Sequence, residues 1–404
     1  MLEGKFFYKG EFLEAGIEIE DGRIKNIGKL IKGKKIRGLI LPAGIDVHVH
    51  FRDFEEKHKE TIETGSLSAL HGGVCLVVDQ PNTKPLIDND KTYFFRMEIA
   101  KKKSYVDYSL NLALTNKNSG EIKEIIKRIS KKYYLPAIGE VFLEHSNEEL
   151  EIGYENLSKI SLLWRVSLHA EDPSFVKNGV PNFLYRPKEA EIIAVRRCIE
   201  ISDFHFCHLS TVEAVKAVEK TDSSFEVTPH HLLLSIEDFE RLKNFVNVNP
   251  PLRERSEVEW LLKNFSKIQI LASDHAPHLS EEKNLGIPGF PGVETMYPIF
   301  VKLATLGIVN FRDLVEKIAV NPAKIFGFRD YGEIEIGKFA NFAVFDLKDS
   351  RKIKAEELHS KCFWTPYEGF EAIFPKKVFL RGEEVLESNV RGGKVILSDF
   401  SSRL

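Results

Sequence analysis

Strand-like apolar runs alternate with amphipathic helical segments through the middle of the chain. This alternation is typical of a parallel sheet whose strands are joined by helices. The helical segments include residues 63–71, 91–103, 121–131, 187–200 and 211–220. The eight strand candidates lie at residues 39–50, 73–82, 105–114, 134–143, 163–172, 203–210, 224–231 and 267–278. Eight such units predict an α/β fold of the TIM-barrel type, a (β/α)8 barrel, over residues 43–331.

The two ends of the chain have a different pattern. Residues 1–42 and 332–404 contain short strand-like runs separated by glycines and charged residues. Asp21-Gly22, between two alternating segments, predicts a tight hairpin turn. We therefore expect the N-terminal and C-terminal parts to form one small β domain beside the barrel.

Composition and charge exclude several classes of protein. The 404 residues carry a formal net charge of -3, which gives no general attraction to nucleic acid or to an anionic membrane. No apolar run approaches the length of a membrane span. The four cysteines are scattered without a C-x-x-C pair, which favours a reducing cytoplasm. Phosphate-binding glycine loops and a nucleophile elbow are also missing, so we expect no nucleotide cofactor.

Histidines and carboxylates gather at the predicted strand ends. In the first strand, side-chain alternation puts His48, His50 and Arg52 on one side. Four other strands end in Glu140, His169, His208 and Asp274. Barrel enzymes collect their catalytic groups at these carboxyl ends, and imidazoles with carboxylates are typical zinc ligands. The set predicts one or two Zn²⁺ ions per chain, whereas His230 and His231 fit either the site or ordinary packing.

The chain resembles the amidohydrolase superfamily over nearly its whole length and, within it, the dihydroorotases. The matching motifs are PAGIDVHVHFRD, HKET, QPNT, LHAED, CHLST, EVTPHHL, NPPLR, SDHAPH and PGVET. The resemblance implies zinc-dependent, reversible cyclisation of N-carbamoyl-L-aspartate to (S)-dihydroorotate, the third step of de novo pyrimidine synthesis. It also implies a possible association with aspartate carbamoyltransferase.

The same resemblance assigns roles to individual residues. Asp274 becomes the proton carrier, and Arg52, Asn82 and His278 hold the substrate carboxylate. The ring is contacted by Asn249 and by the backbone of Pro288 and Gly289. Arg52 suits this role because a guanidinium binds a carboxylate through paired hydrogen bonds. The alternative for Arg52 is a structural ion pair with Asp53 or Glu55.

The sequence departs from the family pattern at two places. Many members end the fourth strand with a carboxylated lysine that bridges two metals, but here the segment is Gly139-Glu140-Val141. The carboxylate of Glu140 would have to replace that carbamate, so one metal and two metals both remain open. The second departure is Asp53-Phe54-Glu55, where Asp-Pro-Gly is common, and it removes no ligand.

Two other functions compete with this interpretation. One is a related cyclic amidase, an allantoinase or dihydropyrimidinase, whose family usually lacks an arginine at the position of Arg52. The other is an inactive scaffold that only supports a partner enzyme, although such a protein should have lost its metal ligands. The Gly/Pro-rich segment 285–292 is the candidate for a loop that closes over the substrate.

Overall fold

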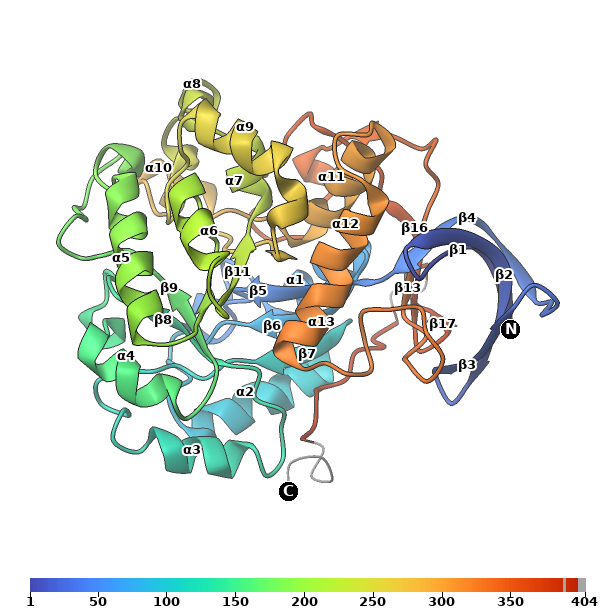
Figure 1. Ribbon diagram of the computed structural model, residues 1–404, viewed down its shortest axis with the longest axis horizontal. Helices are drawn as coiled ribbons and strands as arrows, with labels where there is room; N and C mark the ends of the chain where they lie inside the picture. Colours follow the sequence, from blue (N-terminus) through green and yellow to red (C-terminus); the bar gives the residue numbers. More distant parts are fainter. Residues whose placement is uncertain (388–389, 399–404) are drawn as a thin grey trace.

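The computed structural model describes residues 1–387 and 390–398. Its larger part is a barrel of eight parallel strands, which lies beside the blue N-terminal strands in Figure 1. Each strand falls within one of the eight predicted runs. The strands are β5 (Gly44–Val49), β6 (Val74–Asp79), β7 (Asp107–Leu110), β8 (Ile138–Phe142), β9 (Val166–His169), β10 (His205–Phe206), β11 (Ser224–Val227) and β12 (Ile270–Leu271).

Two seams close the barrel. β5, β6 and β7 form one sheet, and β8 to β12 form another. At the first seam Gly139 N–H donates to the Leu112 carbonyl over 3.0 Å, and at the second His50 N–H donates to the His275 carbonyl over 2.8 Å. Parallel bridges between the same segments continue the ladder around the ring. The predicted (β/α)8 fold is therefore confirmed.

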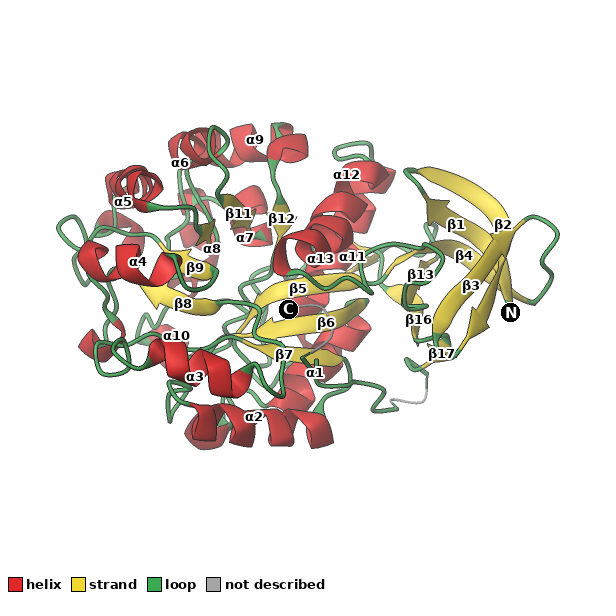
Figure 2. Ribbon diagram, turned by 60° about the horizontal axis from the view of Figure 1, so that its bottom comes forward, coloured by secondary structure: helices red, strands yellow, loops and turns green. Residues whose placement is uncertain are grey.

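Helices surround the barrel strands (Figure 2). All five predicted helical segments are confirmed, and no end is shifted by more than two residues. Apolar strands and the inner faces of these helices share one continuous core. The helices are α1 (Ile62–His71), α2 (Asp90–Lys103), α3 (Ile122–Ile129), α4 (Tyr154–Ser161), α5 (Lys188–Ile201), α6 (Val212–Val218), α7 (Pro229–Leu233), α8 (Phe239–Leu242), α9 (Arg255–Lys263), α10 (Ser280–Asn284), α11 (Val293–Thr305), α12 (Phe311–Val315) and α13 (Asn321–Phe326).

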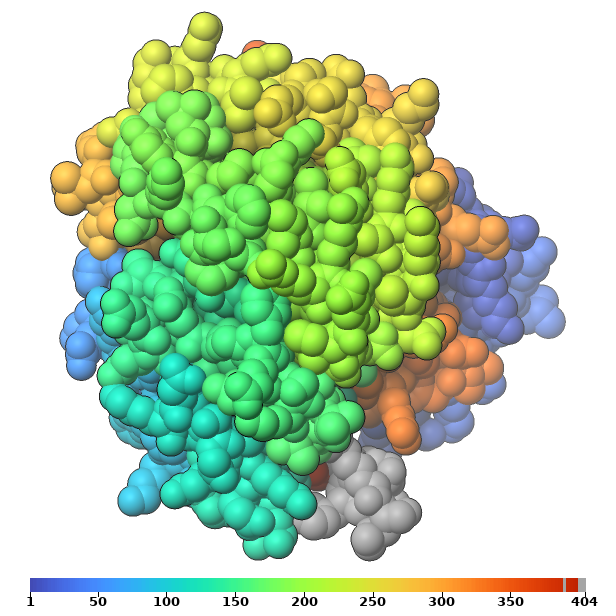
Figure 3. Space-filling model, turned by 60° about the vertical axis from the view of Figure 1, so that its left-hand side comes forward, coloured from blue at the N-terminus to red at the C-terminus, as the bar shows by residue number. Residues whose placement is uncertain are grey.

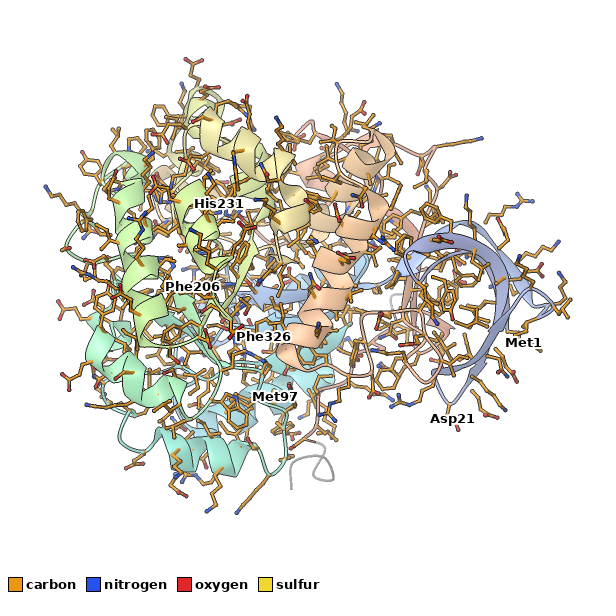
Figure 4. The ribbon with its side chains drawn as sticks, viewed as in Figure 1. Met1, Asp21, Met97, Phe206, His231 and Phe326 are labelled. Carbon is orange, nitrogen blue, oxygen red and sulfur yellow. The ribbon has the colours of Figure 1, made fainter. Side chains whose placement is uncertain are left out.

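Figure 3 shows the face of the molecule formed by the green and yellow middle of the chain, with the dark-blue N-terminal residues behind it at the right-hand edge. Figure 4 labels Phe206 and His231 within the barrel, and Met1 and Asp21 far from it. No helix among the described residues is long and apolar enough to cross a bilayer.

Both termini contribute to a seven-stranded sheet beside the barrel. Its order is β17-β16-β13-β4-β1-β2-β3, and it has a separate apolar cluster that includes Phe6, Ile17 and Phe342. Asp21 and Gly22 both have positive φ and form the predicted turn between β2 and β3. The strands are β1 (Leu2–Tyr8), β2 (Glu11–Glu20), β3 (Arg23–Gly28), β4 (Lys34–Pro42), β13 (Phe342–Phe345), β16 (Pro375–Leu380) and β17 (Glu383–Glu384).

Two C-terminal segments that we expected in the small domain pack on the barrel instead. The first runs from residue 353 to residue 374, between the sheet strands β13 and β16. It follows β14 (Arg351–Lys352) and contains β15 (Glu371–Ala372), and these two short strands pair with each other. Its apolar side chains join the barrel core because they cover α11. In the second, Val395 and Leu397 bridge to Tyr108 and Tyr133 of the barrel. Residues 388–389 and 399–404 of the predicted domain lie outside the described part of the chain.

Candidate metal and substrate site

A cavity of about 1030 Å³ opens at the carboxyl ends of the barrel strands. Every residue that the sequence proposed for the site reaches its wall, except His48, which is buried just behind it. The wall residues among them are His50, Arg52, Asn82, Glu140, His169, His208, Asn249, Asp274, His278, Pro288 and Gly289.

The first ligand group lies where β5 meets the end of β12. The His50 Nε2 atom is 3.1 Å from Asp274 Oδ1, and His48 Nε2 is 3.6 Å from the same oxygen. Glu140 Oε2 completes the group at 3.4 Å from His48 Nε2 and 3.8 Å from His50 Nε2. Two imidazole nitrogens and two carboxylate oxygens therefore face one another.

The second ligand group uses the other oxygen of the same glutamate. Glu140 Oε1 lies 2.7 Å from His208 Nε2 and 3.3 Å from His169 Nδ1. The two ring nitrogens are 3.3 Å apart. One carboxylate therefore joins two histidine pairs, with one oxygen directed at each pair.

These distances fit zinc. Ligand atoms about 2.0–2.1 Å from a tetrahedral zinc stand roughly 3.3 Å from one another, close to the separations in both groups. His48 Nε2 is buried and has no hydrogen-bond partner among the described residues, although it faces two carboxylates. A bound cation would satisfy this nitrogen, so the residues fit the metal that the sequence predicts.

Polar partners fix the orientation of three of the four histidines. His48 Nδ1 lies 2.5 Å from Glu226 Oε1, His50 Nδ1 lies 2.9 Å from Asn82 Oδ1, and His169 Nε2 lies 2.8 Å from Glu171 Oε2. Acceptors of this kind hold a histidine with its other nitrogen free to ligate a metal.

The carboxylates make the cluster strongly attractive to cations. Burial alone would raise the pKa of Glu140, but His48, His169 and His208 hold it well below its ordinary value. Burial alone would lower the pKa of His169, yet Glu140 and Glu171 raise it to about 9. Glu140 is therefore anionic, and it draws positive charge onto the neighbouring nitrogens.

Three residues of the site have a backbone that non-glycine residues rarely adopt. The φ angles are 47° at Arg52, 35° at His208 and 44° at Asp274. Such conformations cost about 1–3 kcal/mol each and persist where the surrounding structure imposes them. At Arg52 the backbone carbonyl accepts a hydrogen bond from Arg96 Nη1 over 2.7 Å, and Arg96 is itself completely buried against Asp79.

A second part of the cavity wall carries Arg52 and His278. Arg52 Nη2 lies 3.2 Å from His278 Nε2, and no carboxylate of the described residues is within ion-pair distance of the guanidinium. Asp53 is engaged elsewhere, since its Oδ2 accepts from the Ile62 N–H over 3.2 Å. The structural ion pair considered for Arg52 is therefore absent from the described residues. His278 stays neutral because burial and the nearby Arg52 lower its pKa to about 3.

Two amide side chains complete this wall. Asn82 gives its oxygen to His50 and so keeps its NH₂ group for another acceptor. Asn249 Oδ1 accepts from Asn182 Nδ2 over 2.8 Å, and both asparagines line the cavity. The wall therefore offers hydrogen-bond donors and a positive charge to a ligand.

Several supporting residues escaped the sequence analysis. Glu226, the lone carboxylate of a buried strand, and Glu171, two residues beyond a candidate ligand, carried a recognisable signal. His231 is satisfied by Thr228 Oγ1 and the Pro250 carbonyl, and His230 packs edge-on against Phe290. Neither of these two histidines belongs to the cavity wall.

A further group of possible ligands, His71, Glu294 and His359, lies outside the cavity. The His71 and His359 rings are stacked with centroids 3.7 Å apart. Two imidazoles on one tetrahedral zinc hold their centroids roughly 5 Å apart, as His48 does with His50 at 5.2 Å and His169 with His208 at 4.8 Å. The barrel-rim cluster therefore has the better geometry for a metal.

Comparison with known proteins identifies relatives of the chain. The profile of the Amidohydrolase family matches residues 39–385. A dihydroorotase of Archaeoglobus fulgidus is 62% identical over 98% of this chain and 99% of its own, and that of Pyrococcus furiosus is 39% identical over 98% and 94%. Among solved structures, an L-hydantoinase of Arthrobacter aurescens has a TM-score of 0.91 at 21% identity, covering 98% of this chain and 99% of its own. That low identity shows the shared fold alone.

Proposed function

Because the chain belongs to the amidohydrolase family and, within it, to the dihydroorotases, we propose how its cavity interconverts N-carbamoyl-L-aspartate and (S)-dihydroorotate. The observation that carries the assignment of roles is the pairing of two walls. A cluster of zinc-type ligands shares one cavity with an arginine that forms no ion pair with a described carboxylate. A cyclic amide with one ring carboxylate fits both parts of the cavity: its amide would lie at the zinc-type ligands, and its carboxylate would lie at the arginine.

The metal would be zinc, held in two positions. His48, His50 and Asp274 would hold one ion, His169 and His208 would hold the other, and Glu140, which lies between the two groups, would serve both. In this arrangement the carboxylate of a glutamate would replace the carbamate of a carboxylated lysine. When bound, zinc acts as a Lewis acid that lowers the pKa of water to about 7 and polarises a carbonyl.

Asp274 would carry the proton in both directions. Burial raises its pKa, but His50 and His48 bring it below the ordinary value, so the carboxylate is ready to accept. In hydrolysis it takes the proton of the attacking water and gives it to the leaving ring nitrogen. In cyclisation it takes a proton from the ureido nitrogen and gives it to the departing hydroxyl.

The substrate would be oriented by its carboxylate. Arg52 and His278 stand close enough together to contact one carboxylate, and the free NH₂ group of Asn82 supplies a further donor. Asn249 and the backbone of Pro288 and Gly289 line the same cavity, where they would contact the ring. Charge-assisted bonds from a guanidinium are strong and directional, so this wall selects acidic rings.

Activity of the purified protein on dihydroorotate, allantoin and hydantoin, with zinc counted on the same sample, tests this proposal. Turnover of dihydroorotate alone, with two zincs per chain, is the expected result. Turnover of an uncharged ring would support the related cyclic amidases instead. Bound metal without any turnover would support an inactive scaffold.

Two further aspects belong to the same proposal. Cys75, Cys198, Cys207 and Cys362 are buried free thiols, which suits a reducing cytoplasm. Association with aspartate carbamoyltransferase stays a prediction from the family resemblance.

A further inference from the structure

Lys283, on the short helix α10, is a buried ammonium group that lies behind the substrate wall. The side chain is 0% exposed. Its Nζ donates to three backbone carbonyls: Asn247 over 2.7 Å, Ile287 over 2.8 Å and Gly289 over 3.0 Å. An ammonium has three protons, so these carbonyls satisfy it completely.

Burial makes this charge costly. Among the described residues no carboxylate pairs with Lys283, and desolvation lowers its pKa well below the ordinary value. The faces of Phe290 and Trp364, whose centroids lie 5.3 and 5.5 Å from Nζ, offset part of the cost. An apolar side chain of similar length would fill the space without that cost, so the hydrogen bonds are the feature that needs a lysine.

The three carbonyls belong to two loops that form the cavity wall. Asn247 lies two residues before Asn249, whereas Ile287 and Gly289 flank Pro288. The loops also bond directly, because Gly289 N–H donates to the Asn247 carbonyl over 3.1 Å. Lys283 therefore sits at the junction of the loops that carry the proposed ring contacts.

A third loop is attached at the same junction. Asn182 N–H donates to Asn247 Oδ1 over 2.9 Å, and Asn182 Nδ2 donates to the Asn249 side chain. Asn247 Nδ2 in turn donates to the Gly286 carbonyl over 3.0 Å. A shift of the Asn247 backbone would therefore move Asn249 as well as the 286–289 loop.

We propose that Lys283 is a positioning residue that fixes Asn249 and the Gly289 backbone against the substrate ring by its three carbonyl bonds. This inference rests on the proposed function, because it assumes that those groups contact dihydroorotate. Lys283 itself is absent from the cavity wall and touches no substrate. Its effect should therefore appear in substrate binding and spare the metal.

The test replaces Lys283 with methionine, which has similar length and no donor. Lys283→Met should raise KM for dihydroorotate at least about tenfold while kcat changes much less and zinc content stays unchanged, because small misplacements of binding groups are costly. The control is Lys317→Met, which removes another buried lysine, paired with Glu316 away from the cavity. Its KM should equal that of the wild type.

A double-mutant cycle separates positioning from general loosening of the fold. In an Asn249→Ala background, Lys283→Met should raise KM by clearly less than it does in the wild type, because the contact that it positions is already gone. Full, independent multiplication of the two effects, or an unchanged KM in Lys283→Met, would overturn the inference. If Lys283→Met fails to fold, Lys283→Gln, which keeps two donors, replaces it. Lack of dihydroorotate turnover in the wild type would instead refute the proposed function.

Discussion

The two walls of the cavity have opposite electrostatic character. On one wall, imidazole nitrogens surround the buried carboxylates of Glu140 and Asp274. On the other, Arg52 stands beside a neutral histidine and forms no ion pair with a described carboxylate, although it is near enough to Glu56 to lower the pKa of that residue. The first wall attracts a cation, and the second offers a guanidinium and amide donors to an anion.

This difference shows how one barrel rim separates chemistry from recognition. Metal ligands come from strand ends, where the closed ladder fixes them in place. Several substrate contacts come from loops that are held by side chains such as Lys283. Changes on the first wall should therefore affect kcat or metal content, and changes on the second should affect KM.

Asp274→Asn should have the largest effect. The amide cannot carry the proton, so kcat should fall at least about 100-fold while zinc remains bound by the histidines. Steady-state kinetics and metal analysis of the same sample measure both quantities. Asp222→Asn, at an exposed position, is the matched control. Near-normal turnover of Asp274→Asn would rule out its role as proton carrier.

Glu140→Gln should have the second-largest effect, a loss of bound zinc. Its two oxygens face two histidine pairs, so loss of the negative charge should leave fewer than two zincs per chain. Metal content after dialysis against buffer measures the loss, and activity should fall with it. Full retention of two zincs would show that Glu140 is not the bridge.

Arg52→Met should weaken substrate binding and leave the metal in place. Loss of a charge-assisted contact worth about 2 kcal/mol should raise KM for dihydroorotate by about 30-fold. Zinc content should stay at the wild-type value. Arg196→Met, on the exposed surface of α5, serves as control. If zinc is lost together with activity, Arg52 is a structural residue of the metal wall.

Glu226→Gln should have the smallest effect of the four. Glu226 touches His48 on the side away from the metal position, and residues of this kind change metal affinity by about tenfold. Titration with a zinc-binding dye compares this variant with the exposed Glu213→Gln control. An affinity equal to that of the wild type would mean that Glu226 only fills space.

The sequence predicts the barrel because apolar strand-like runs alternate with amphipathic helical segments, and it predicts the rim because side chains alternate along a strand. His48 and His50, two residues apart, point to the same side of the strand, where both face Asp274 and Glu140. The supporting contacts could not be predicted, since Lys283 meets the Asn247 carbonyl 36 residues away in the chain.

The sequence does not predict where the short C-terminal segments pack. Short apolar runs such as the one around Val395 fit either the terminal sheet or the outside of the barrel. Local pattern does not distinguish the two places, because both offer an apolar surface and an unpaired strand edge. The division of the chain into domains at residues 42 and 331 accordingly stays a prediction.

A crystal structure of the zinc-loaded protein with dihydroorotate bound tests the central claim most directly. The account predicts two zinc ions, one on each oxygen of Glu140, and the substrate carboxylate against Arg52 and His278. A substrate bound with its carboxylate away from Arg52, or metal elsewhere than the Glu140 cluster, would contradict it.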